Sequence, residues 1–208
     1  MTDISLRSKG GGGSSAPPYK GITPVPAGYF AGKYYAADVD TRFFAQAAIA
    51  ANTIYLLPFT PKVTHTWQSF ILPCASSGTG NVRIAIYESD AEYYPADVLI
   101  ESASFVKASG INDVTINQEL TAGETYWLAC QSDGGIWTSG FTHVTGNSIA
   151  LHTPVMGVMG FEANHFVSLN NLMGSPFLAH TYGAFPDPIS GWDYTTTTTF
   201  VPMMLLKA

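Results

Sequence analysis

Charged residues are scarce in this sequence. Only 12% of its 208 residues are Asp, Glu, Lys or Arg, whereas an ordinary soluble domain has about 25%. Nine residues are basic and fifteen are acidic, which gives a formal net charge of −6. A nucleic-acid-binding surface needs clustered Lys and Arg, and the basic residues here are scattered, so we expect no nucleic-acid partner. So few charges also predict buried contacts between subunits, in a homo-oligomer such as a trimer or another symmetric ring.

Cysteine and long apolar runs are also rare. Cys74 and Cys130 are the only two cysteines, and each lies in an apolar, strand-like pattern that predicts a small buried hydrophobic residue. A disulfide between them is the alternative. Polar residues interrupt the apolar stretch 43–57, so we expect no membrane insertion. Residues 1–7 lack the basic start and apolar run of a signal peptide, which favours synthesis in a bacterial cytoplasm.

Motifs that carry chemistry are missing as well. The sequence has no Gly-x-Ser-x-Gly elbow and no phosphate-binding loop. Glu162 and His165 have the spacing of a metal-binding helix, but the residues around them do not predict a helical bundle. Asp38 and Asp40 could hold a cation through oxygen atoms, although paired Asp in a loop usually faces water. We therefore expect no metal, no cofactor and no catalytic residue.

Residues 1–51 are predicted to form an extended N-terminal arm. A Gly-rich linker at 10–15 precedes a segment with four prolines, which keep the chain extended. A disordered tail would be poor in aromatic residues, but this region contains several. They predict an arm that docks on another protein and becomes ordered there. The candidate anchoring residues are Tyr19, Tyr29, Phe30, Tyr34 and Tyr35. The Ala-rich stretch 36–51 fits a short helix or an extended segment.

From residue 52 onward the sequence predicts strands. In Asn81–Glu88, the residues Val82, Ile84 and Ile86 alternate with others, as in a strand with one buried face. The stretch Glu124–Gln131 shows a similar alternation. Turn signals recur about every 8–12 residues, a spacing typical of sandwiches and jelly rolls. We predict an all-β protein with a jelly-roll-like antiparallel β-sandwich over residues 52–208.

Three stretches within roughly residues 52–131 also resemble a known module. They are Asn81-Val-Arg-Ile-Ala-Ile-Tyr87, Tyr94-Pro-Ala-Asp-Val-Leu-Ile100 and Leu120-Thr-Ala-Gly-Glu-Thr-Tyr-Trp-Leu-Ala129. They are similar to a β-sandwich module of virion proteins in tailed bacteriophages, prophages and gene-transfer-agent-like particles. The resemblance implies a non-enzymatic structural or adhesive role as a head or tail fibre, spike or decoration subunit. It also implies a location in the virion. Residues 1–51 and 132–208 lie outside the match, so the docking of the arm on other virion proteins is our own inference.

The alternative function is recognition of host surface polysaccharide. Aromatic faces and short polar side chains on the loops of a rigid sandwich are suited to hold sugars. The candidate glycan-binding residues are Tyr93, Tyr94, Asp133, Trp137, Trp192 and Asp193. The tryptophans could equally cover the ends of the sandwich or pack between subunits. A polysaccharide-cleaving enzyme would require paired carboxylates in one cleft, and Glu88, Asp90 and Glu92 lie in a turn, where acidic side chains normally face water.

Overall fold

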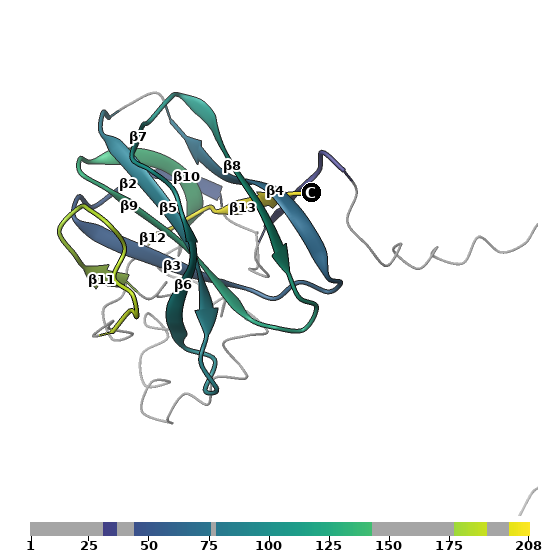
Figure 1. The fold of residues 1–208 in the computed structure, drawn as a ribbon. Coiled ribbons are helices and arrows are strands. Elements are labelled where there is room, and N and C mark those ends of the chain that lie inside the picture. The colour runs from purple at the N-terminus through teal and green to yellow at the C-terminus, as the bar shows by residue number, and fades with distance from the viewer. Residues whose placement is uncertain (1–30, 37–43, 76–77, 143–176, 191–199) are drawn as a thin grey trace, which may run out of the picture.

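The computed structural model describes residues 31–36, 44–75, 78–142, 177–190 and 200–208. These residues form two antiparallel sheets packed face to face, and this part of the chain contains no helix (Figure 1). The predicted all-β, jelly-roll-like sandwich is therefore confirmed. Residues 1–30 of the predicted arm lie outside the described residues.

The strands divide into a seven-stranded sheet A and a six-stranded sheet B. Sheet A consists of β1 (Tyr34–Ala36), β2 (Phe44–Ile49), β4 (His65–Cys74), β8 (Gly110–Leu120), β10 (Ile136–Thr142), β12 (Phe200–Pro202) and β13 (Leu205–Lys207). Sheet B consists of β3 (Thr53–Phe59), β5 (Asn81–Ser89), β6 (Pro95–Glu101), β7 (Phe105–Val106), β9 (Tyr126–Ser132) and β11 (Phe177–Ala179).

Strand pairing follows the nested order of a jelly roll. Strand β2 pairs with β10, β3 with β9, β4 with β8, and β5 with β7. Successive pairs alternate between sheets A and B, so an antiparallel ribbon wraps around one core. Strands β4 and β10 are paired at a single position, where Cys74 lies opposite Thr138. Along the rest of these facing edges, β4 pairs with β13 and β10 pairs with β12.

The main core fills the space between the sheets. Trp67 of β4 is fully buried, and the rings of Phe59 and Tyr35 meet its indole edge to face at centroid distances of 5.3 and 5.6 Å. Such contacts add stability beyond the burial of area. The free thiols of Cys74 and Cys130 are buried in the same cluster. The prediction of two small buried residues is thus confirmed, and the disulfide alternative is wrong.

The central strands of sheet B are buried on both faces, which corrects the expectation of one buried face for residues 81–88. Ala85 and Tyr87 of β5 point away from the main core, yet both are fully buried. They belong to a second apolar cluster with Trp127 and Ala129 of β9. Residues 177–190 supply its cover, including Phe185.

Residues 44–49 form β2, so this part of the Ala-rich stretch is extended rather than helical. Strand β4 continues through Pro73 to Cys74. Near the end of the sequence, the described residues form two short strands, β12 and β13.

Candidate functional site

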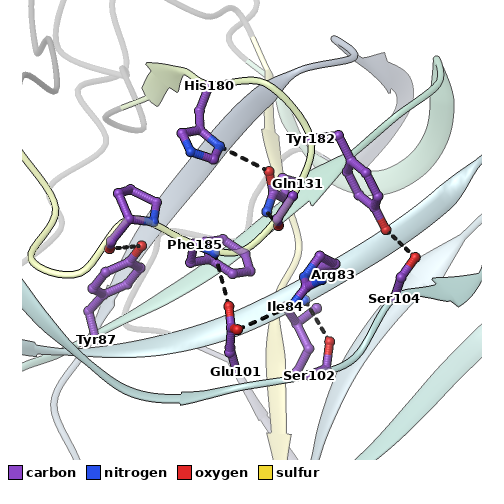
Figure 2. Close-up of polar contacts among 12 residues, drawn as sticks. Arg83, Ile84, Tyr87, Glu101, Ser102, Ser104, Gln131, His180, Tyr182 and Phe185 are labelled. Atoms are coloured by element: carbon purple, nitrogen blue, oxygen red, sulfur yellow. Dashed lines mark hydrogen bonds and ion pairs between the residues drawn. The ribbon is translucent and has the colours of Figure 1, made fainter.

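The outer face of sheet B is crossed by residues 177–190, which we call the strap. Strand β11 at its start pairs with β3, and the strap then passes over β9 and β5 to reach β6. At its far end, the Ile189 amide donates a hydrogen bond of 3.0 Å to the Ala96 carbonyl oxygen. Side chains from β9, β5 and β6 form hydrogen bonds with the strap (Figure 2).

Glu101 joins the strap to the centre of sheet B. One carboxylate oxygen lies 3.1 Å from the Arg83 guanidinium, and the other accepts a 2.9 Å hydrogen bond from the Phe185 amide. Figure 2 shows the carboxylate between these two partners. The Arg83 and Glu101 side chains are 19% and 32% exposed, so the ion pair is partly shielded from water. The charge thus fixes a loop instead of facing an open cleft.

Gln131 of β9 binds the strap through both ends of its amide. Its Nε2 donates to the Gly183 carbonyl oxygen at 2.6 Å, and its Oε1 lies 3.4 Å from Nδ1 of His180. The side chain is fully buried. Because a buried amide without partners is costly, these contacts make the strap an integral part of the folded domain.

Tyr87 completes the attachment. Its hydroxyl donates a 3.1 Å hydrogen bond to the Pro186 carbonyl oxygen, and its ring meets Phe185 edge to face at a centroid distance of 6.1 Å. Burial raises the pKa of Tyr87, and the nearby Glu101 and Asp187 carboxylates raise it further. The phenol therefore stays protonated and serves as a donor. These contacts favour a structural role for the strap over a chemical one.

The β5–β6 hairpin tip forms a rigid loop at one end of the sandwich. The Asp90 carboxylate accepts hydrogen bonds from the Glu92 and Tyr94 amides at 3.0 and 2.8 Å. The Asp90 amide donates to the Tyr94 carbonyl oxygen at 2.8 Å. From the opposite side, Nε1 of the buried Trp127 donates to the Tyr93 carbonyl oxygen at 3.1 Å. The tip is thus tied to the second apolar cluster.

Tyr93 is the residue that this loop displays. Its side chain is 47% exposed, and its backbone has a φ of 68°. Bulky residues rarely adopt the left-handed region, because Cβ then crowds the backbone. Backbone strain of this kind concentrates at binding sites. A phenol ring held on a rigid base can stack on an apolar face, and its hydroxyl can donate or accept hydrogen bonds.

Among the other predicted glycan-binding residues that the structure describes, Asp133 and Trp137 lie away from Tyr93. Tyr94 follows it in the tip and is half-buried. Asp133 lies beside Asn81, at the opposite end of β5 from Tyr93, and β5 itself spans about 26 Å at 3.3 Å per residue. The Asp133 carboxylate accepts hydrogen bonds of 2.7 and 2.6 Å from the backbone amide and side chain of Asn81. Trp137 lies in β10 of the other sheet, opposite Ala48. Trp192 and Asp193 are outside the described residues.

Only some of the predicted anchoring residues of the arm lie within the described residues. Tyr19, Tyr29 and Phe30 lie outside the described residues. Tyr34 and Tyr35 form part of β1, where they are paired with Lys207 and Leu206 of β13. Sheet A therefore takes β1 and β2 from within the range predicted as an arm.

Sequence reasoning missed the residues that attach the strap, above all Gln131 and Glu101. A signal was present, since Ala85 and Tyr87 make the second face of β5 apolar. In the described residues, no three His, Cys, Asp or Glu side chains gather closely enough to hold a metal ion. Nor does this part of the chain contain a helix long and apolar enough to cross a membrane.

A comparison with known protein families finds no match, and a comparison with curated proteins finds no relative.

Proposed function

We propose that the chain is a structural subunit of a tailed bacteriophage or a related particle. Its N-terminal arm anchors it to other particle proteins, and the jelly-roll domain projects outward as part of a fibre, spike or decoration. The observation that supports the proposal most is that residues in the stretches resembling the virion module have structural roles in this fold. Pro95 begins β6, Gly123 takes a left-handed turn with a φ of 80°, and Tyr126 and Leu128 are core residues. These residues build a scaffold.

The tightly attached strap supports the same role. Side chains that could serve catalysis elsewhere, such as Glu101, His180 and Tyr87, instead bind backbone groups or other side chains within the domain. A domain closed in this way resists unfolding and proteolysis better than one with an open face. Such resistance suits a protein displayed outside the cell.

The experiment for this proposal is mass spectrometry and cryo-electron microscopy of particles from a host strain carrying the gene. We expect the chain in purified particles, with residues 1–30 against neighbouring proteins and the sandwich facing outward. A matched strain without the gene should lack this density. Absence of the chain from intact, purified particles would refute the proposal.

Recognition of host surface polysaccharide is a second candidate function, and Tyr93 favours it. An exposed aromatic ring on a strained, firmly held hairpin is the kind of feature that stacks on sugars. The test compares binding of the purified domain to host polysaccharide before and after Tyr93→Ala. Val106→Ala is the matched control, because Val106 is 75% exposed and lies in β7, which pairs with the other end of β5. Equal binding by both variants would exclude the Tyr93 site.

A further inference from the structure

Among the described residues, strand β8 leaves one edge of sheet A open. It pairs with β4 from residue 110 to 120, and no other strand in the described part of the chain pairs with it. The register shifts between Trp67 and Ser69 of β4, opposite Asn117 of β8, which has a φ of 48°. This bulge interrupts the edge. Residues 110–116 therefore form a regular stretch whose outward amide and carbonyl groups can pair with a further strand.

An open groove of about 520 Å³ lies beside this edge. It separates the first half of β8 from the segment that links β6 to β7. Phe105 and Val114 line it, and both also pack against the main core. Ile111, which is 56% exposed, contributes a further apolar side chain, and Ser104 and Thr115 add hydroxyl groups. An apolar groove beside an open strand edge fits an extended segment that adds as a strand.

The sequence outside the described residues contains a segment with the matching pattern. Residues 2–8 read Thr-Asp-Ile-Ser-Leu-Arg-Ser, so that Ile4 and Leu6 would share one face of a strand. On an added strand these two side chains would enter the groove beside Val114. Asp3, Ser5 and Arg7 would then face solvent.

The reach of the arm allows the segment to meet a neighbouring copy. The Gly32 amide donates a 2.6 Å hydrogen bond to the Ala208 carbonyl oxygen, which fixes the described chain beside β1. Residues 9–31 connect this point to the segment and can span about 75 Å at 3.3 Å per residue. The order β1-β13-β4-β8 puts β8 of the same copy about 14 Å away, at 4.8 Å per strand, so both grooves are within reach. The scarcity of charged residues favours the contact between copies.

We propose that residues 2–8 of one copy add as a strand to β8 of a second copy and fill its groove. This inference rests on the anchoring role proposed above for the arm and names its partner as another copy of the chain. The contact is head to tail, because the arm of one copy meets the sandwich of the next. It therefore closes into a ring wherever the rotation between copies allows.

The test is disulfide cross-linking between two populations of the full-length protein with different tags. One carries Ser5→Cys and the other carries Thr115→Cys or Ile111→Cys, which cover two registers. Adjacent strands bring such residues within disulfide distance, and the native thiols are buried. Glu124→Cys, in the exposed turn before β9, is the control. We expect about tenfold more mixed-tag dimer with a β8 cysteine than with this control.

Two outcomes would overturn the proposal. One is equal cross-linking to β8 and to the Glu124→Cys control. The other is a double variant, Ser5→Cys with Thr115→Cys, that forms only an internal disulfide, which would mean that the segment fills the groove of its own copy.

A second measurement tests the apolar contact. Ile4→Asp with Leu6→Asp should reduce the oligomer to monomer in light scattering, whereas Asp3→Asn with Ser8→Ala should not. An unchanged oligomer in the first variant would count against the proposal. Because both experiments use purified protein, they can succeed even if the chain proves absent from particles, which separates this inference from the proposed function.

Discussion

The indole nitrogen of the buried Trp127 donates a 3.1 Å hydrogen bond to the backbone carbonyl oxygen of the exposed Tyr93. Trp127 belongs to the cluster that the strap covers, whereas Tyr93 is at the tip of the β5–β6 hairpin. The bond therefore connects the buried cluster on the outer face of sheet B to an exposed aromatic residue. A tip held in this way presents Tyr93 at little entropic cost on binding.

The first prediction concerns the strained backbone of Tyr93. Glycine adopts a φ of 68° without steric cost, whereas a β-branched residue is strained there. We expect Tyr93→Val to be less stable than Tyr93→Gly by about 1–2 kcal/mol. The free energy of unfolding from urea titration is the measurement. Equal stability of the two variants would mean that the loop relaxes and that no strain is stored.

The sequence predicted the parts of the fold that depend on local patterns. Alternating Val82, Ile84 and Ile86 marked the core face of β5. The prediction failed where burial depends on distant segments. Tyr87 is covered by Pro186, 99 residues further along the chain, and no short-range pattern near either residue indicates this contact.

For the candidate site, the sequence indicated the residue types but not their arrangement in space. The aromatic residues of the tip stood out in sequence, but their separation from Asp133 follows from the position of the two turns at opposite ends of β5. The left-handed backbone of Tyr93 was also hidden, because tyrosine is not a residue that this conformation favours. Its cause is the hydrogen-bond set of Asp90 and Trp127, which brings together β5, β6 and β9.

The second prediction tests the attachment of the strap. Gln131→Leu keeps the approximate volume but leaves the Gly183 carbonyl oxygen and His180 without the contacts that the amide supplies. We expect a loss of about 1–3 kcal/mol and faster protease cleavage within residues 177–190. The control is Tyr182→Phe, which removes an exposed 2.6 Å contact with Ser104 and should cost about 0.5 kcal/mol or less. Similar cleavage rates in both variants would contradict a central role for Gln131.

The third prediction concerns the two thiols. Burial raises the pKa of Cys74 to about 11, against a smaller opposing effect of Lys107, and burial also raises the pKa of Cys130. At pH 8 only about one Cys74 thiol in a thousand is then ionised, and the thiolate is the reactive form. We expect no labelling by a thiol reagent in the folded protein and two labelled thiols in denaturant. Rapid labelling of one thiol under native conditions would show that the sandwich opens locally.

The last prediction concerns acid stability and Asp113. A hydrogen bond from Ser69 lowers the pKa of Asp113 below its ordinary 3.8, partial burial opposes this, and Lys207 at 3.1 Å lowers it further. Because the folded-state pKa lies below the unfolded one, the stabilisation is fully present above the unfolded value and is lost as pH falls through the folded value.

Asp113→Asn should therefore reduce stability above the ordinary pKa of 3.8 and converge with the unchanged protein as pH falls through the lower folded-state pKa of Asp113. The Asp113 side chain is 39% exposed, so solvent screening limits the difference to about 0.5 kcal/mol. Lys207→Met should produce a smaller shift of the same sign, because it leaves the Ser69 hydrogen bond in place. Urea titrations across this pH range measure both. Curves that stay parallel down to about pH 2 would show that Asp113 has the same pKa in the folded and unfolded chains.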